Sequence, residues 1–230
     1  TQICNDKWKT YHFLMDNGLH APTSFIELKK TQEAIQGGVV KFPVIIKPRW
    51  GMGSISIFKA ENEQELEVLY KKVKREVHES YLKYESNMDP DHSVIIQEYL
   101  DGQEYGLDII NNLNKEYVTT LVKKKTAMRS GETDGAITVK NEILENIGKK
   151  IAKSLGHIAN LDTDCFMVNG TPYILEMNCR FGGGYPFSHL AGANLPSAIG
   201  KWIKNEDVIQ EFEGYQTGVE GRKDIRIIKC

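Results

Sequence analysis

The chain has 230 residues and a formal net charge of −2, with 40% hydrophobic and 26% charged residues. This composition suits a globular protein with a proper core, and the near-neutral charge gives no reason to expect nucleic acid or an anionic membrane as a partner. No apolar run approaches the roughly 20 residues that cross a membrane, and no signal peptide is recognisable. The four cysteines have no CxxC pair or zinc-ligand spacing, so we expect reduced thiols and a cytoplasmic protein.

The first part of the chain alternates short helices and strands. Asn5 or Asp6 is expected to cap a helix that Gly18 ends. Further helices are predicted at residues 31–36 and 62–82, and strands at 24–28, 39–47 and 55–59. Residues 83–92 are polar and contain proline, so we expect a flexible joint there.

The remainder of the chain is richer in strands. Strands are predicted at residues 94–99, 104–111, 117–124, 136–139 and 225–228, with a hairpin turn at 112–115. Helices are predicted at residues 142–155 and 196–204. The alternation indicates an α+β fold with two small sheets rather than one continuous parallel sheet.

A candidate metal site lies near the middle of this second part. Residues 173–180 are typical of a strand in which Glu176 and Asn178 alternate with apolar residues. Side chains two apart on a strand point to the same face, so a carboxylate and an amide oxygen lie side by side. Asp164 lies on a second apolar strand, and Asn169-Gly170 between the strands is a strong hairpin signal. Oxygen ligands without His or Cys favour Mg²⁺ or Mn²⁺, although a solvated polar face is an alternative.

The register of this hairpin decides which side chain joins the metal ligands. With a two-residue loop at Asn169-Gly170, Cys165 shares the face of Glu176. With a three-residue bulged loop that starts at Val168, Asp164 shares that face instead. Because a hard cation needs the carboxylate, we predict the bulged loop.

Two further segments could contact a nucleotide. Lys47 ends an apolar strand, and the turn after it contains Gly51, Gly53 and Ser54. Backbone N–H groups of such a turn can approach phosphate oxygens, although a plain hairpin turn is equally compatible. Residues 95–105 form a strand, a loop and a second strand, whose exposed backbone groups could pair with an adenine, unless this is an ordinary surface loop.

Two arginines are candidates for catalysis. Arg180 directly follows the metal strand and could neutralise charge that develops on a transferred phosphoryl group. Arg129 is expected in a loop between strands, where it could reach the same site or remain solvated. The residues expected near an acceptor substrate are Tyr185, Phe187, Ser188 and His189.

Taken in this order, the segments resemble the ATP-grasp superfamily from Asn5 to about Pro196. The metal hairpin is similar to that of biotin carboxylase, in which an acid, an Asn-Gly turn and Glu-Met-Asn-x-Arg have the same spacing. This similarity also selects Asp164 over Cys165. Residues 181–196 resemble the carbamoyl-phosphate-synthetase-like members of the superfamily.

The resemblance implies an α+β fold of the ATP-grasp type, in which two α+β lobes with antiparallel sheets grip ATP between them. We expect residues 1–20 to be a linking helix from a preceding N-terminal domain. Residues 21–98 would then form the small lobe with the glycine loop, and residues 99–230 the large lobe with the metal site.

The resemblance also implies roles for individual residues. Arg180 would steady an acyl-phosphate intermediate, with Arg129 as the second catalytic candidate. The implied nucleotide contacts are Lys7, Lys47, Gly51, Gly53, Ser54, Glu98, Tyr99, Leu100 and Glu104, the last on the ribose. The implied ligands of Mg²⁺, or of Mn²⁺, are Asp164, Glu176 and Asn178.

The expected activity is that of an ATP-dependent ligase acting on a small-molecule carboxylate and an amine. ATP would phosphorylate the carboxylate, and the amine would then attack the acyl phosphate. One alternative is a carbamoyl-phosphate-synthetase-like phosphotransferase, which would release a phosphorylated product. Another is a non-catalytic ATP-binding module that acts on a partner protein.

Overall fold

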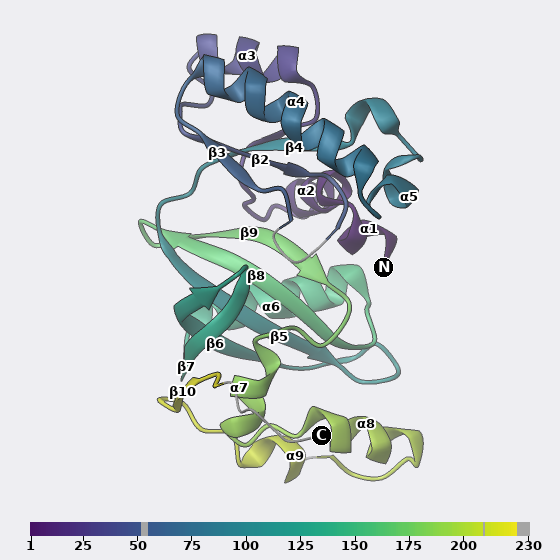
Figure 1. Ribbon diagram of the computed structural model, residues 1–230. Helices are drawn as coiled ribbons and strands as arrows, with labels where there is room; N and C mark the ends of the chain where they lie inside the picture. Colours follow the sequence, from purple (N-terminus) through teal and green to yellow (C-terminus); the bar gives the residue numbers. More distant parts are fainter. Residues whose placement is uncertain (52–54, 209, 225–230) are drawn as a thin grey trace, which may run out of the picture. The chain divides into compact units, whose positions relative to one another are not determined.

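The computed structural model describes residues 1–51, 55–208 and 210–224 (Figure 1). The chain divides into two compact units, Thr1–Gly102 with Val168–Glu176, and Gln103–Met167 with Met177–Cys230. In the described part of the chain, one sheet has four strands and the other has six. The strand pairs are antiparallel, so the predicted α+β class is confirmed. Among the described residues, no helix is both long and apolar enough to span a membrane.

The first unit is built around a four-stranded sheet in the order β1-β4-β2-β3. Its strands are β1 (Ser24–Phe25), β2 (Val44–Pro48), β3 (Phe58–Ala60) and β4 (Val94–Glu98). Its helices are α1 (Gln2–Asn5), α2 (Lys7–Asp16), α3 (Leu28–Gln36), α4 (Glu63–Glu79) and α5 (Lys83–Ser86), with a 3-10 helix at Pro90–His92. The helices predicted at residues 31–36 and 62–82 therefore correspond to α3 and α4.

The core of the first unit lies between this sheet and α4. Figure 1 shows α3 and α4 side by side over one face of the sheet. Leu66, Val73 and Val77 of α4 are fully buried and lie on one face of the helix. Val44 and Ile46 of β2 are two residues apart, so both point into the same cluster. Burial of this apolar stripe holds the helix on the sheet.

The flexible joint predicted at residues 83–92 is wrong. The segment contains α5 and the 3-10 helix, both within the first unit. Its Asp89 carboxylate accepts hydrogen bonds from the Arg49 guanidinium at 2.8 Å and pairs with the His92 ring at 2.8 Å. Polar side chains here are therefore bound to protein partners rather than to solvent alone.

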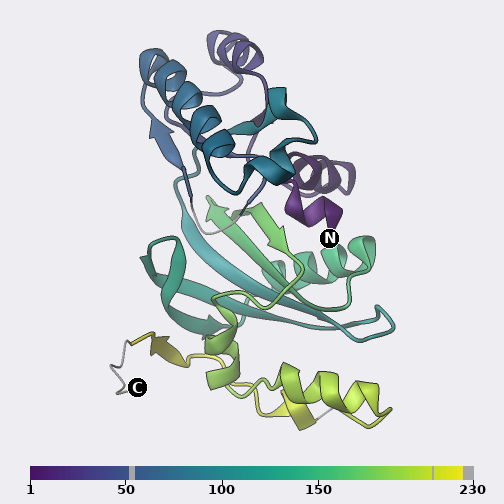
Figure 2. The same ribbon diagram turned by 45° about the vertical axis from the view of Figure 1, so that its right-hand side comes forward.

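The other sheet has the strand order β10-β7-β6-β5-β8-β9. Its strands are β5 (Gln103–Asn111), β6 (Tyr117–Arg129), β7 (Glu132–Val139), β8 (Ala159–Val168), β9 (Thr171–Asn178) and β10 (Glu220–Arg222). The helices of the second unit are α6 (Glu142–Leu155), α7 (Tyr185–Leu190), α8 (Leu195–Ile203) and α9 (Gln210–Glu213). Figure 2 shows the long strands of this sheet from a second side. The strand predicted at residues 225–228 lies outside the described residues.

The two faces of the sheet in the second unit have different neighbours. Helix α6 packs on one face, where Gly148 lies so close to Thr120 that an added Cβ would come within 2.3 Å of the Thr120 hydroxyl. Lys123 lies three residues further along β6 and points to the opposite face. There its ammonium contacts Ser188 of α7 at 3.0 Å. Strand alternation thus separates the α6 face from a face that carries charged residues.

We expect His157, which follows α6, to make the stability of the fold depend on pH. Its side chain is buried, and its Nε2–H donates to the Ile109 carbonyl at 3.0 Å. Burial lowers the pKa of His157, although backbone hydrogen bonds raise it in part. The unfolded imidazole therefore takes up its proton at a higher pH than the folded one does. Stability from this group is present above about pH 6.5 and is lost as the pH falls below it.

We expect His157→Gln to remove this part of the pH dependence. The loss in the unmodified chain is at most about 1.4 kcal/mol per pH unit, the value for uptake of one proton. Urea denaturation at pH 7.5 and pH 5.5 measures the free energy of unfolding of both proteins. An equal fall in both proteins would contradict the assignment.

Candidate functional site

In the first unit, helix α2 starts beside the end of β2. Asp6 caps the helix, because its Oδ1 accepts from the backbone N–H groups of Trp8 at 3.0 Å and Lys9 at 3.3 Å. The two carboxylate oxygens of Asp6 also accept from the Arg49 guanidinium, each at 2.8 Å. The backbone N–H of Lys7 donates to the Arg49 carbonyl at 3.1 Å. A buried bidentate ion pair thus fixes the start of α2 to the segment after β2.

This anchoring holds Lys7 in a buried position. Lys7 is only 9% exposed, and its Nζ donates to the Gly51 carbonyl at 2.7 Å. Burial lowers the pKa of Lys7, while the carboxylates of Glu176 and Asp6 raise it. Lys47, at the same end of β2, is also buried. Two buried lysines therefore lie near the end of β2 and Gly51, and buried ammonium groups can bind phosphate oxygens.

The end of β4 carries the three residues predicted to line an adenine pocket. The Glu98 carboxylate accepts from the Thr23 backbone N–H at 3.1 Å and from its hydroxyl at 2.8 Å. Tyr99 is 39% exposed, and the Lys59 ammonium lies 4.6 Å from the centre of its ring. Leu100 is 9% exposed. The Glu98 side chain is therefore engaged in holding Thr23, which leaves Tyr99 as the accessible side chain of this group.

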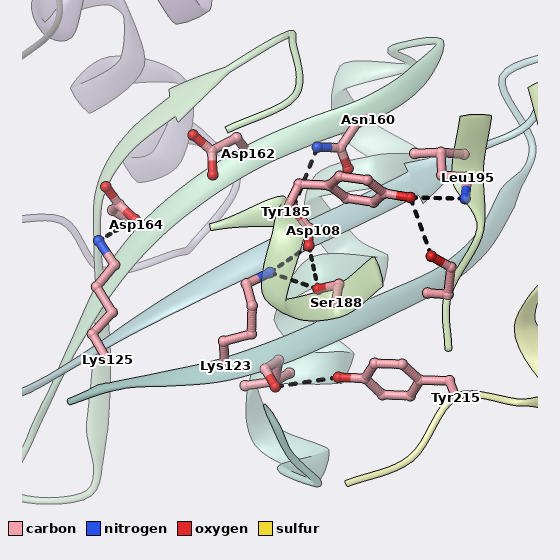
Figure 3. A network of polar contacts seen from close by, with 12 residues as sticks. Asp108, Lys123, Lys125, Asn160, Asp162, Asp164, Tyr185, Ser188, Leu195 and Tyr215 are labelled. Carbon is pink, nitrogen blue, oxygen red and sulfur yellow. Dashed lines mark hydrogen bonds and ion pairs between the residues drawn. The ribbon is translucent and has the colours of Figure 1, made fainter. Parts of the chain in front are cut away.

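In the second unit, charged side chains gather on the face of the sheet opposite α6 (Figure 3). Gly106 of β5 pairs with Lys123 of β6 on one side and with Asp164 of β8 on the other. The Lys125 ammonium lies 2.7 Å from both the Asp164 and the Glu104 carboxylates. Burial lowers the pKa of Lys125, but these two carboxylates outweigh it and raise the pKa overall. A cationic group is thus held between two acids.

Asp162 adds a further carboxylate to this face. It lies two residues before Asp164 on β8, and its Oδ2 accepts from Arg180 Nη1 at 3.1 Å. Burial, together with the Asp164 and Asp108 carboxylates, raises the pKa of Asp162 to about 7. Gly182 lies directly against this carboxylate, because an added Cβ would be 2.0 Å from Asp162 Cγ. Carboxyl groups are therefore clustered along β8, and carboxylate oxygens are the ligands that a hard cation prefers.

The hairpin between β8 and β9 has a two-residue loop. β8 ends at Val168 and β9 begins at Thr171, and the φ angles of Asn169 and Gly170 are 49° and 79°. Positive φ at both central residues is the pattern of a type I′ turn. The predicted three-residue bulged loop is therefore wrong, because Asn169 itself adopts the left-handed conformation that asparagine tolerates.

Asp164 and Cys165 nevertheless have different surroundings. Cys165 is fully buried, and burial raises the pKa of its thiol to about 12. A protonated thiol is a poor ligand for a hard cation. The Asp164 carboxylate is paired with Lys125 on the charged face. By the register argument, the two-residue loop alone would place Cys165 on the face of Glu176. The choice of Asp164 as a metal ligand therefore stays a prediction that rests on the resemblance and on this difference in surroundings.

The family model for the ATP-grasp domain matches residues 4–184. The chain belongs to the ATP-grasp family. The resemblance found in the sequence is therefore confirmed.

Solved structures show the same ATP-grasp fold. The biotin carboxylase domain of Hydrogenobacter thermophilus 2-oxoglutarate carboxylase, solved with MgADP, ADP and bicarbonate, has a TM-score of 0.76 at 12% identity, over 95% of this chain and 49% of that one. Biotin carboxylase from Campylobacter jejuni, in a β-γ-ATP complex, has a TM-score of 0.76 at 15% identity, over 95% and 50%. L-amino acid ligase from Bacillus licheniformis has a TM-score of 0.61 at 18% identity, over 94% and 52%. The chain thus spans about half the length of these structures.

The site residues predicted for this ATP-grasp chain belong to both units. The first unit contains Lys7, Lys47, Gly51, Glu98, Tyr99, Leu100 and Glu176. The second unit contains Glu104, Arg129, Asp164, Asn178 and Arg180. Gly53 and Ser54 lie outside the described residues. No group of three or more His, Cys, Asp or Glu side chains that could hold a metal occurs within residues 1–51, 55–208 and 210–224, and the metal ligands stay predictions.

Arg129 is the predicted residue whose placement differs most. It is the last residue of β6 rather than part of a loop, and its side chain is about half exposed. Its guanidinium lies 2.6 Å from Asp134 Oδ1 on the neighbouring strand. The catalytic role of Arg129 stays a prediction.

Lys125 and the Asp6–Arg49 pair were missed by the sequence reasoning. Lys123 and Lys125 belong to a short lysine-rich run, and such a run is also typical of a solvent-exposed segment. The signal that could have found them is their spacing, because residues two apart on a predicted strand share one face. Arg49 carries no such signal, since its partner Asp6 is distant in the sequence.

Proposed function

We propose that this chain is the ATP-grasp part of an ATP-dependent ligase that joins a small-molecule carboxylate to an amine. The observation that carries the proposal is the grouping on β8. Asp164, a predicted metal ligand, lies two residues after Asp162 on the charged face of β8 (Figure 3). The Asp162 carboxylate accepts a hydrogen bond from Arg180, the predicted phosphoryl-transfer cation. Phosphoryl transfer needs acids that hold a divalent cation and a fixed guanidinium near them.

The proposed reaction has two steps. A carboxylate oxygen of the substrate attacks the γ-phosphorus of ATP, the bond from that phosphorus to the bridging oxygen breaks, and ADP leaves. The amine then attacks the carbonyl carbon, the carbon–oxygen bond to phosphate breaks, and the amine loses its proton. Positioning and electrostatic stabilisation suffice for both steps, so no side chain is required as a nucleophile.

In this proposal, different residues of the chain bind the phosphates, the metal ion and the adenine. Lys7 and Lys47 bind phosphate oxygens as buried point charges, and Arg180 stabilises the phosphoryl group in transfer. A Mg²⁺ ion, or Mn²⁺, bound by Asp164, Glu176 and Asn178 would supply further charge neutralisation. The all-oxygen character of these side chains fits such an ion. Tyr99 and Leu100 line the adenine pocket, and Glu98 supports them by holding Thr23.

We also propose that the complete enzyme works in the cytoplasm and includes a domain before the position of Lys7, with residues 1–20 as the link. The proposed additional domain is supported by the lengths of the solved ATP-grasp chains named above, because this chain covers only about half of each of them.

Calorimetry of MgATP binding tests the proposal. We expect Glu176→Ala combined with Asn178→Ala to weaken binding by more than about tenfold, which is 1.4 kcal/mol. The matched control replaces the exposed Glu116 and Asn114 of the β5–β6 turn with alanine, and it should leave binding unchanged. The same proteins are then assayed for ADP release with a panel of carboxylates and amines.

Each result has a distinct meaning. MgATP binding that ignores the Glu176 and Asn178 substitutions would contradict the metal assignment. MgATP binding with no ADP release for any pair, also in the presence of the proposed preceding domain, would favour the non-catalytic module. ADP release that needs no amine and yields a phosphorylated product would favour the phosphotransferase.

A further inference from the structure

A buried carboxylate, Asp108, lies on the charged face of the second unit but takes no part in the proposed site (Figure 3). It is 0% exposed. Its Oδ2 accepts from the Lys123 ammonium and from the Ser188 hydroxyl, the latter at 2.5 Å. Its Oδ1 accepts from Asn160 Nδ2 at 3.3 Å. These four residues are called the Asp108 network below.

The Asp108 network holds both ends of residues 180–188. At one end, Asn160 Nδ2 also donates to the Arg180 carbonyl at 3.2 Å. At the other end, Ser188 brings α7 to the network, and Lys123 Nζ donates to the Ser188 hydroxyl at 3.0 Å. Between the two ends, an added Cβ on Gly184 would lie only 3.3 Å from Lys123 Cε. The glycine segment therefore runs closely over the lysine side chain.

The arrangement of Ser188 and Lys123 is not that of a nucleophile and its base. Ser188 is 0% exposed and Lys123 is 1% exposed, so a substrate does not reach either group. The Ser188 hydroxyl donates to Asp108 and accepts from the lysine, which leaves no free proton acceptor beside it. The Lys123 ammonium is ion-paired with Asp108 and cannot act as a base while protonated. The earlier expectation that Ser188 touches the acceptor substrate is therefore wrong.

A buried ion pair is also a weak source of net stability, because desolvation of two charges offsets their attraction. Such a pair does define geometry, since a displaced partner leaves an uncompensated charge. Residues 182–184 are three glycines and have little conformational preference of their own. The backbone conformation beyond Arg180 is then fixed by contacts, which include the packing of Gly182 against Asp162 and the network contacts at the two ends of the segment.

We propose that Asp108, Lys123, Asn160 and Ser188 are positioning residues that fix Arg180 and the glycine segment 182–184 against Asp162. The inference rests on the proposed role of Arg180 in phosphoryl transfer. The Arg180 guanidinium contacts Asp162, but the Arg180 side chain is long, flexible and 39% exposed. The network anchors the backbone from which that side chain extends, and so sets where the guanidinium reaches. Transfer rates are sensitive to displacements of about 1 Å.

Hydrogen exchange measured by mass spectrometry tests the anchoring without any substrate. In Ser188→Ala and in Asp108→Asn we expect the amides of residues 181–187 to exchange at least about tenfold faster than in the unmodified chain, because opening of the segment loses its anchor. Labelling of Arg180 by phenylglyoxal, followed in the same proteins, should also become faster. If Ser188→Ala does not fold, Asn160→Ala replaces it and removes the link to the Arg180 carbonyl.

Asn111→Ala is the matched control. Asn111 is a buried residue of the same strand, and its Nδ2 donates to the Ala152 and His157 carbonyls at 3.4 Å and 2.9 Å. Its loss should speed exchange at the end of α6 and leave residues 181–187 unchanged. A general loosening of the unit would instead speed exchange in both places in every variant.

Activity provides the second readout. We expect the network variants to lower ADP release at least tenfold while MgATP affinity changes less than about twofold. Unchanged exchange and unchanged Arg180 labelling in folded variants would overturn the proposal, and so would faster exchange with unaltered ADP release. If the unmodified chain releases no ADP, the proposed ligase function fails, while exchange and labelling still decide whether the network positions Arg180.

Discussion

Arg180→Met is expected to lower the rate of ADP release by about 10²–10³-fold, the usual effect of removing one preorganised donor to the transition state. MgATP affinity should change by less than about threefold. Methionine keeps the length of the side chain but removes the charge and the donors that now face Asp162. Because negative charge on the phosphoryl group is redistributed during transfer, the loss is felt mainly in turnover.

The measurement compares steady-state ADP release with calorimetric MgATP affinity in three variants. Arg180→Lys keeps a positive charge without the planar fork, and we expect an intermediate rate. Arg75→Met is the control, because Arg75 is exposed on α4 in the first unit. A loss of MgATP affinity with an unaltered maximal rate would assign Arg180 to ground-state binding and contradict a role in transfer.

The elements that could be predicted from the sequence are those defined by local patterns. The apolar spacing of α4 and α6 and the alternation along β8 and β9 are signals within one segment. The length of the hairpin loop was not predictable in this way. Asn169-Gly170 allows either a type I′ turn or a bulge, and the choice depends on whether Asn169 or only Gly170 adopts positive φ.

The charged face could be predicted only in part. Asp164 belongs to the sequence motif of the metal hairpin. Lys125 can be assigned to the charged face only because β6 and β8 both pair with β5. That alignment depends on the registers of three strands that are far apart in the sequence, and no local pattern contains them. The same reason explains Ser188. Its burial beside Asp108 depends on how α7 packs, which the Phe181–His189 sequence does not state.

Polarity alone also led to the wrong prediction for residues 83–92. A polar residue is typical of a solvated surface, but it can equally be the partner of a buried charge. Asp89 accepts from Arg49, whose side chain is 8% exposed and is shared with Asp6. Long-range ion pairs of this kind have no signature in one sequence.

The second large effect is expected when the buried Asp6–Arg49 ion pair is broken. Arg49→Met is expected to lower the free energy of unfolding of the first unit by about 3–5 kcal/mol, because it leaves the Asp6 carboxylate buried without its partner. That carboxylate is 3% exposed and accepts two hydrogen bonds of 2.8 Å from the guanidinium. Urea denaturation measures the change. The exposed Lys59–Glu61 pair is the control, and Lys59→Met should leave the urea midpoint nearly unchanged.

A double variant separates the uncompensated charge from the anchor itself. Asparagine caps a helix as well as aspartate does, so Asp6→Asn combined with Arg49→Met keeps the cap of α2 and removes both charges. We expect it to regain most of the lost stability. The Lys7 ammonium would still lose the bidentate anchor that fixes α2 beside Gly51, so MgATP binding should remain weaker than in the unmodified chain. Full recovery of both properties would show that the ion pair has no role in placing Lys7.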